Sequence, residues 1–312
     1  MKSSNWITGG KVFQKEFAAG DSLESAKLCI TAKGIYEAFL NGKRVGDLVL
    51  TPGFTSYNKN HLYQEYDVTD MLKENNELVI YAGEGWAMGT LAWENNDKIF
   101  SDTIAIIAKL SIKYKDKEEV IITDETWKCG ESPVIYESIY HGETFDANIE
   151  PQFNDFAVII DADKNILNPQ DGENIKEQER LKPVEFIKTQ KGETVIDFGQ
   201  NMTGYVEAVI KNAKKGEKLK ISHAEILDND GNFYTENLRA AKALLEYTCK
   251  DGDQTYKPHF TFMGFRYIRI DEAPENVSYT AIVVHSDMKR TGHFECSDKL
   301  VKIGRASCRE RV

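Results

Sequence analysis

The sequence has no long hydrophobic run. An uninterrupted apolar stretch such as residues 104–108 has only five residues, far short of the roughly 20 residues that a membrane-spanning helix needs. The first residues, Met1 to Trp6, lack the apolar region of a secretory signal. We therefore expect a protein that does not bind or cross a membrane and that, with this N-terminus, stays in the cytoplasm.

Cysteines are few and scattered. The chain has five of them, an odd number with no C-x-x-C pair: Cys29, Cys129, Cys249, Cys296 and Cys308. Paired cysteines at regular spacing would indicate a disulfide framework or a zinc site. We therefore expect reduced thiols and no metal cluster built on them.

Basic patches and nucleotide-binding motifs are also missing. Lys and Arg number 39 against 50 Asp and Glu, a net charge of −11, and no basic cluster is interleaved with aromatic residues, which argues against nucleic acid as a partner. The sequence contains no G-x-x-x-x-G-K-[ST], G-x-G-x-x-G or G-x-S-x-G motif, so neither nucleotide chemistry nor acyl transfer is indicated. Neutral ligands fit this composition better.

The residues present predict an all-β fold of two antiparallel β-sandwiches. The 312 residues suffice for about two domains, and short β-segments broken by turns dominate, the clearest being a hairpin at residues 35–45 around Asn41-Gly42. We expect an N-terminal jelly-roll sandwich at residues 1–150, a connector at 151–185 that is rich in turn signals, and a second sandwich at 186–287. One strand of this second sandwich is expected at residues 259–270.

Catalytic and metal-binding patterns are weak. Asp228, Asp230 and Glu236 surround a turn-forming Gly-Asn pair, which favours a hairpin over a pair of catalytic carboxylates. His223 and Glu225 share one face of a predicted strand, as strand alternation alone produces. Only calcium in a sandwich loop is hard to exclude, because it needs nothing but oxygen ligands; no other cofactor is expected.

Aromatic residues beside polar loops suggest a different kind of site. Aromatic faces flanked by polar groups commonly hold neutral sugars, and core packing is the competing interpretation. The candidates are Phe54, Tyr57, Tyr63, Trp86 and Trp93.

Several sequence strings resemble the bacterial α-L-rhamnosidases. GIYEAFLNGKRVGD, LTPGFTSYNK, GEGWAMG and IYHGETFDA are similar to their N-terminal sandwich, and VIDFGQNMTGYV, SHAEILDNDGNFYTENLRAA and HFTFMGFRYIRI to their concanavalin-like sandwich, in the same order. The resemblance implies an inverting glycoside hydrolase that removes terminal α-L-rhamnose from glycosides or polysaccharides. It also implies that the catalytic acid and base lie on a C-terminal (α/α)6 barrel.

The resemblance further implies binding and docking residues. Some relatives bind rhamnose, with calcium, on an N-terminal module, for which the sugar-binding candidates here are Asn41, Asp47, Trp86 and Trp93; turn formation and core packing are the alternative roles. Loops that dock on the barrel are expected to carry Asp197, Gln200, Asn201, Glu236, Asn237 and Arg239.

The similarity ends near the C-terminus of the sequence. Residues 288–303 are similar to the entry into the barrel, whereas residues 304–312 are basic, match nothing in the family and are interpreted as a non-native tail. We therefore expect the 312 residues alone to be catalytically inactive and name no catalytic residue. A free-standing rhamnose-binding protein and a structural module that needs a partner chain are the alternatives, and the oligomeric state, including a homo-oligomer, stays open.

Overall fold

The computed structural model describes residues 1–91, 96–289, 291–292 and 295–298. The chain forms two compact units: unit 1 contains Met1–Gly172 and His259–Thr261, and unit 2 contains Glu173–Pro258 and the chain from Phe262 onward. Strands dominate both units, which confirms the all-β prediction. Within the described ranges, no helix is both long and apolar enough to span a membrane.

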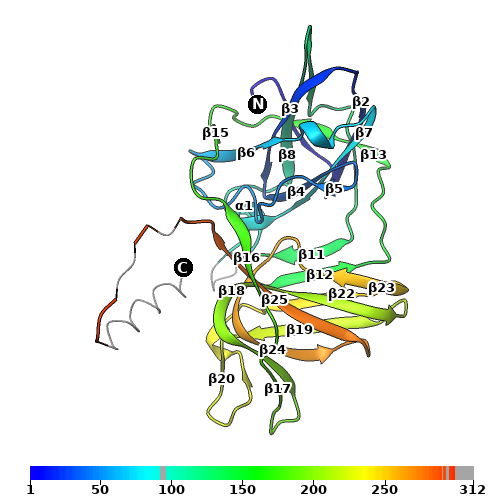
Figure 1. Cartoon of the computed structure of the whole chain (residues 1–312). Helices are drawn as coiled ribbons and strands as arrows, with labels where there is room; N and C mark the ends of the chain where they lie inside the picture. Colours follow the sequence, from blue (N-terminus) through cyan, green and yellow to red (C-terminus); the bar gives the residue numbers. More distant parts are fainter. Residues whose placement is uncertain (92–95, 290, 293–294, 299–312) are drawn as a thin grey trace. The chain divides into compact units, whose positions relative to one another are not determined.

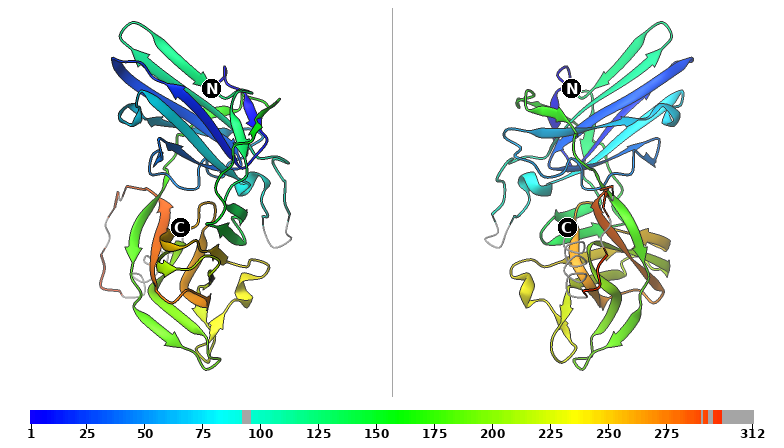
Figure 2. Two further views of the ribbon diagram at one scale, coloured as in Figure 1. Left: turned by 90° about the vertical axis from the view of Figure 1, so that its right-hand side faces the viewer. Right: turned by 60° about the vertical axis from the view of Figure 1, so that its left-hand side comes forward.

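Unit 1 is a sandwich of two sheets (Figures 1 and 2). The first sheet has the order β14-β1-β8-β3-β6-β15, with β9 added to β8. Its strands are β1 (Trp6–Thr8), β3 (Leu23–Lys33), β6 (His61–Asp67), β8 (Ala105–Tyr114), β9 (Glu118–Ile122), β14 (Val158–Ile160) and β15 (Leu167–Pro169). All pairings are antiparallel except that of β15 with β6, which is parallel. The prediction of purely antiparallel sheets is wrong for this one edge strand.

The second sheet of unit 1 has the order β13-β10-β2-β7-β4-β5. Its strands are β2 (Val12–Ala18), β4 (Ile35–Leu40), β5 (Lys43–Arg44), β7 (Asn75–Gly83), β10 (Lys128–Gly130) and β13 (Asp155–Phe156). Two short helices, η1 (Thr69–Met71) and α1 (Gly85–Met88), and a hairpin of β11 (Val134–Ser138) and β12 (Gly142–Asp146) complete the unit.

The core of unit 1 lies between its two sheets. Alternate side chains of each strand face inward, so that β8 contributes Ile106 and Ile112 while β2 and β7 contribute Phe13 and Ile80. All four side chains are fully buried, as is Trp127. Each buried aliphatic or aromatic side chain of this size contributes roughly 1.5–3 kcal/mol to stability.

The hairpin predicted at residues 35–45 is confirmed. β4 and β5 are joined by Asn41 and Gly42, whose φ angles are +54° and +76°. Both angles are positive, as a two-residue type I′ turn requires, and Asn and Gly tolerate them best. The turn fixes the register of β4, and with it the face on which Glu37 and Phe39 lie.

The segment predicted as a connector, residues 151–185, carries short strands. β13 pairs with β10, β14 with β1, and β15 with β6, all within unit 1. β16 (Ile175–Leu181) belongs to unit 2 and pairs with β25. Short strands with Pro, Gly and charged residues are typical of sheet edges, which explains why the segment looks like a linker in the sequence.

Unit 2 is built on one curled sheet with the order β22-β19-β24-β18-β25-β16, to which β17 and β23 are added beside β18. Its other strands are β17 (Glu185–Lys188), β18 (Thr194–Ala213), β19 (Lys218–Ala224), β22 (Leu244–Thr248), β23 (Gly252–Tyr256), β24 (Met263–Glu272) and β25 (Val277–Ser286). A small hairpin of β20 (Ile226–Leu227) and β21 (Phe233–Tyr234) precedes the short helix η2 (Glu236–Leu238).

The strand expected at residues 259–270 begins four residues later. β24 starts at Met263, because the carboxylate of Glu143 accepts hydrogen bonds from the backbone N–H groups of both His259 (2.8 Å) and Phe260 (3.0 Å). Backbone donors bound by a side chain are not available to a sheet ladder. The residues before β24 therefore leave the strand path and join unit 1.

Candidate functional site

The outer face of the second sheet of unit 1 carries an unusual mixture of side chains. Strand register places Phe39 beside Val79 and Glu37 beside Tyr81, all pointing away from the sandwich core. Beyond Val79 lies Gln14, which donates a hydrogen bond to the carboxylate of Glu77 at 2.5 Å. This sheet face therefore carries both apolar side chains, such as Phe39 and Val79, and charged ones, such as Glu37 and Glu77.

Glu37 is the centre of a charged cluster on this face. Its carboxylate accepts a hydrogen bond from Nδ1 of His259 at 2.8 Å and another from Nη2 of Arg44 at 2.9 Å. The Glu37 side chain is only 12% exposed, so the two cations compensate most of the cost of burying its charge.

The cluster shifts the titration of both partners. Burial acts to lower the pKa of His259, but the charge and hydrogen bond of Glu37, assisted by Glu143, raise it to about 9. Burial acts to raise the pKa of Glu37, but the charges and hydrogen bonds of His259 and Arg44 hold it below the usual range. At neutral pH His259 is therefore an imidazolium, and both ring nitrogens are donors.

A cavity of about 320 Å³ lies beside His259. Its floor is the outer sheet face, with Phe39, Glu77, Val79 and Tyr81. Its wall comes from the β11–β12 hairpin, the residue before it and the segment around residue 259, with Pro133, Val134, Phe145 and His259, and Gly42 also lines the cavity. The rings of Phe145 and His259 are stacked, with centroids 5.5 Å apart. Glu77 also lines a second, more open cavity of about 580 Å³ that Asn41 lines too.

A separate cluster of aromatic rings includes three of the predicted sugar-contact residues. Phe54 lies 6.0 Å from Tyr57 and 6.3 Å from Trp86 between ring centroids, and Phe100 packs on both Phe54 and Tyr57. Phe54 is 58% exposed, whereas Tyr57 is buried and continues inward to His61. The exposed ring of Phe54 therefore packs on the buried ring of Tyr57.

The other predicted sugar-binding residues are dispersed. Asn41 uses its amide for the fold, since Nδ2 donates to the carbonyl of Met71 and to Oδ1 of Asn76, and Oδ1 accepts from the backbone N–H of Glu77. Asp47 is exposed beyond β5, and Trp93 lies outside the described residues. Sugar binding by Asn41, Asp47, Trp86 and Trp93 stays a prediction, and the contacts of Asn41 favour its structural role.

In unit 2, the string DFGQN forms a wide bulge in β18. Asp197 pairs with Tyr267 and Met202 with Phe265, so four residues of β18 face a single residue of β24. That residue, Arg266, binds both oxygens of Asp197, at 2.9 Å and 2.7 Å. Bulges change the direction in which side chains leave a strand. This bulge is held by the two hydrogen bonds between Arg266 and Asp197, which we call the Arg266 clamp.

The residues within and near the bulge are arranged around this clamp. Gly199 has a φ of +84° and donates its N–H to Asp197 at 2.6 Å, a conformation that suits glycine best. Asn201 donates to the carboxylate of Glu225 at 3.1 Å, and Gln200 is half-buried. The hydrogen bonds of Arg266 and Gly199 hold the pKa of Asp197 below its usual range, against the effect of burial.

The remaining predicted docking residues follow the β20–β21 hairpin. Glu236, Asn237 and Arg239 lie on and just after η2, and all three are exposed. The structure thus distributes the six residues over two segments of unit 2. Their docking role stays a prediction.

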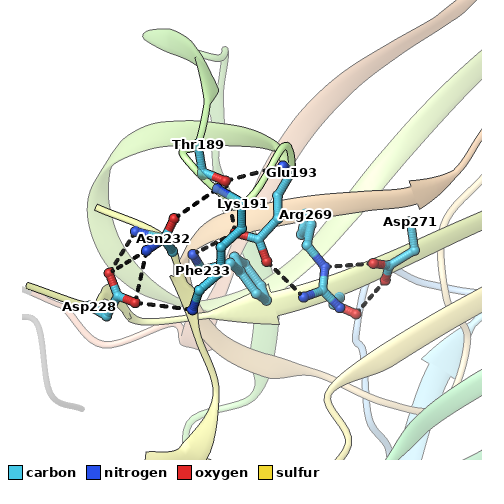
Figure 3. A network of polar contacts seen from close by, with 9 residues as sticks. Thr189, Lys191, Glu193, Asp228, Asn232, Phe233, Arg269 and Asp271 are labelled. Carbon is cyan, nitrogen blue, oxygen red and sulfur yellow. Dashed lines mark hydrogen bonds and ion pairs between the residues drawn. The ribbon is translucent and has the colours of Figure 1, made fainter. Parts of the chain in front are cut away.

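A polar network holds the β20–β21 hairpin in unit 2 (Figure 3). Glu193 accepts hydrogen bonds from Thr189, from the backbone N–H of Phe233 and from Arg269. Arg269 in turn donates to Asp271 at 2.6 Å. Asp228 accepts hydrogen bonds from the backbone N–H groups of Asp230 and Asn232 inside the hairpin loop, which are the contacts expected of a turn residue.

His223, which shares a predicted strand face with Glu225, lies in an apolar environment. His223 is buried against Phe265, and burial lowers its pKa to about 4 despite a hydrogen bond to the carbonyl of Ala243. Among the residues that the structure describes, no three His, Cys, Asp or Glu side chains are grouped as a metal site. Calcium binding stays a prediction.

The comparisons with known proteins match the chain to two consecutive domain families. Residues 21–179 match the family described as the alpha-L-rhamnosidase N-terminal domain, and residues 187–286 match the bacterial alpha-L-rhamnosidase concanavalin-like domain. The chain belongs to the bacterial α-L-rhamnosidase family. The family resemblance seen in the motifs, from the Asn41-Gly42 hairpin to the Arg266 clamp, is confirmed.

Full-length rhamnosidases are much longer than this sequence. An alpha-L-rhamnosidase of Streptomyces avermitilis is 35% identical over 288 residues, covering 86% of this chain and 28% of the relative, and one of Formosa agariphila is 31% identical, covering 92% and 33%. The crystal structure of the native enzyme from Aspergillus terreus has a TM-score of 0.89 at 37% identity, covering 95% of this chain and 36% of that one. The chain therefore spans about a third of the length of these relatives.

Sequence reasoning missed the cluster around Glu37. Glu37 and His259 are 222 positions apart, and each looks like an ordinary strand residue in its own segment. The available signal was a Glu in the middle of the hydrophobic hairpin strand 35–40, because a largely buried carboxylate needs a cationic partner.

Proposed function

We propose that the two units are the N-terminal, non-catalytic part of an α-L-rhamnosidase that hydrolyses terminal non-reducing α-L-rhamnose from glycosides or polysaccharides with inversion. The observation that carries the proposal is the match of two consecutive rhamnosidase domains, in order, over residues 21–286. The acid and base that inversion requires would then lie in sequence beyond the two units.

The 312-residue protein alone is expected to show no hydrolysis of 4-nitrophenyl α-L-rhamnoside, because both units are β-domains matched to non-catalytic parts of the family. The assay follows release of 4-nitrophenolate at increasing protein concentration, with a known α-L-rhamnosidase as positive control. Turnover that rises in proportion to the purified chain would contradict the proposal.

Sequencing the encoding DNA from the codon of Gly292 onward, in the original source, tests the same proposal independently. We expect a reading frame that continues after Ile303 into an acid-rich helical segment of several hundred residues, as the length of the relatives suggests. A stop codon directly after Val312 in the source would favour a free-standing protein instead.

Carbohydrate binding by the chain itself is the second candidate function, and the exposed ring of Phe54 beside Trp86 favours it. Aromatic faces of this kind stack on the apolar faces of sugar rings. Trp86→Ala is then expected to weaken the binding of methyl α-L-rhamnoside about tenfold in calorimetry. Phe156→Ala, which removes another exposed aromatic ring of unit 1, is the control and should leave the affinity unchanged.

A further inference from the structure

The cavity beside His259 has the composition of a small-ligand site. Its volume of about 320 Å³ falls within the range of about 300–1,000 Å³ typical of such sites. Six of its nine lining residues are apolar or aromatic, and they come from both the floor and the wall. The apolar faces of a ring-shaped ligand would therefore contact apolar side chains on two sides of the cavity.

The polar groups of the cavity are few and incompletely used. Nδ1 of His259 is bound to Glu37, but Nε2 has no hydrogen bond to any residue that the structure describes. The carboxylate of Glu77 accepts from Gln14 through Oε1 only, and within the same described ranges the hydroxyl of Tyr81 is likewise unpaired. The cavity thus offers a cationic N–H donor, a carboxylate acceptor and a hydroxyl.

We propose that this cavity binds one neutral pyranose residue, with the apolar face of the sugar ring against Phe39, Val79 and Phe145 and its hydroxyls on His259 and Glu77. A purely apolar ligand would remove water from these polar groups without replacing the hydrogen bonds that they make to it, which is unfavourable. An anionic ligand would meet the carboxylate of Glu77, which His259 does not neutralise because it is paired with Glu37. A neutral sugar satisfies both constraints.

The proposed site differs from the residues suggested by the sequence. It uses none of Asn41, Asp47, Trp86 and Trp93, and it includes no metal ligand. It goes beyond the carbohydrate binding proposed above, because it is a site separate from the Phe54–Trp86 cluster and does not rest on binding there. The more open cavity that shares Glu77 adjoins it, so a further sugar unit of a longer chain would extend toward the β4–β5 turn.

The test is calorimetric titration of the complete 312-residue chain with methyl α-L-rhamnoside, methyl β-D-glucopyranoside and sodium glucuronate. We expect saturable binding of at least one neutral glycoside and at least tenfold weaker binding of glucuronate. Val79→Phe fills the floor of the cavity and, measured in the Trp86→Ala background so that the Phe54–Trp86 cluster does not contribute, should abolish the remaining binding. Val120→Phe, the same change at an exposed position of β9 in the other sheet, should leave it unchanged.

Glu77→Gln supplies a second variant that does not depend on how the cavity accommodates a larger side chain. It keeps the shape of the side chain and its contact with Gln14 while removing the charged acceptor, and should weaken binding about tenfold, since hydrogen bonds to charged groups contribute about 1.5–3 kcal/mol.

Three results would overturn the proposal. They are wild-type affinity in both Val79→Phe and Glu77→Gln, loss of binding in Trp86→Ala with none in the cavity variants, or no saturable binding of either neutral glycoside to the folded wild-type chain. Each of them leaves the assignment to an α-L-rhamnosidase intact, because that assignment is tested by hydrolysis and by the source DNA.

Discussion

Glu37→Ala is expected to lower the free energy of unfolding of unit 1 by about 3 kcal/mol at pH 7. The substitution leaves His259 and Arg44 without their shared carboxylate, and removing one partner of a buried ion pair typically costs 3–5 kcal/mol; the partial exposure of both cations, 31% and 27%, places the expectation at the lower end. All four tryptophans of the chain belong to unit 1. Urea unfolding followed by tryptophan fluorescence therefore reports on this unit.

Glu65→Ala provides the matched control. Glu65 forms an exposed ion pair with Lys27 in the same unit, and such pairs contribute about 0–1 kcal/mol. A loss in Glu37→Ala no larger than that in Glu65→Ala would show that the cluster is not a stabilising element.

The same cluster predicts how stability depends on pH. The pKa of His259 is about 9 in the folded protein and near 6.5 in an unfolded chain, so the folded state binds the proton more tightly. Its contribution is fully present below about pH 6.5 and is lost as the pH rises through 9. Between pH 7 and 10 the wild type should therefore lose about 2 kcal/mol more than Glu37→Gln, which removes the charge but keeps an acceptor. Equal pH slopes for the two proteins would contradict this.

Arg266→Ala is expected to destabilise unit 2 by about 2 kcal/mol. Asp197 is almost fully buried in the β18 bulge, and without Arg266 its carboxylate keeps the N–H of Gly199 as its one partner among the residues that the structure describes. Arg266→Lys should cost less, because lysine restores the charge without the two-pronged geometry. The measurement is hydrogen exchange of the β18 and β24 amides, since unit 2 contains no tryptophan.

Lys211→Ala is the control for this prediction. Lys211 forms an ion pair with Asp253 in the same unit, and both side chains are 56% exposed, so its removal should change stability by no more than about 0.5 kcal/mol. Exchange rates in Arg266→Ala that match those of Lys211→Ala would mean that the bulge does not need the Arg266 clamp.

The sequence predicts the local features of the fold well. The hairpin of β4 and β5 follows from Asn41 and Gly42, because two adjacent residues that tolerate positive φ leave few alternatives to a type I′ turn. The strands follow from alternation of buried and exposed side chains, which is equally local. The start of β24 at Met263 could not be predicted, because it depends on Glu143 binding the backbone of His259 and Phe260.

The candidate site depends on contacts between distant positions, and for that reason the motifs identify it poorly. The motif around Asn41 marks a turn whose polar atoms are used internally. DFGQN and GFRY are separate strings in the sequence, yet Asp197 and Arg266 form one clamp. A single sequence shows which residues a motif contains but not which distant partner completes it.

The distance along the chain between Glu37 and His259 also affects biosynthesis. His259 is made 222 residues after Glu37, which at about 5–20 residues per second corresponds to roughly 10–45 s of translation. During that interval Arg44 has already been synthesised, whereas His259, the other cationic partner of the Glu37 carboxylate, has not. The charge balance around Glu37 is therefore completed only when most of the following unit has been synthesised.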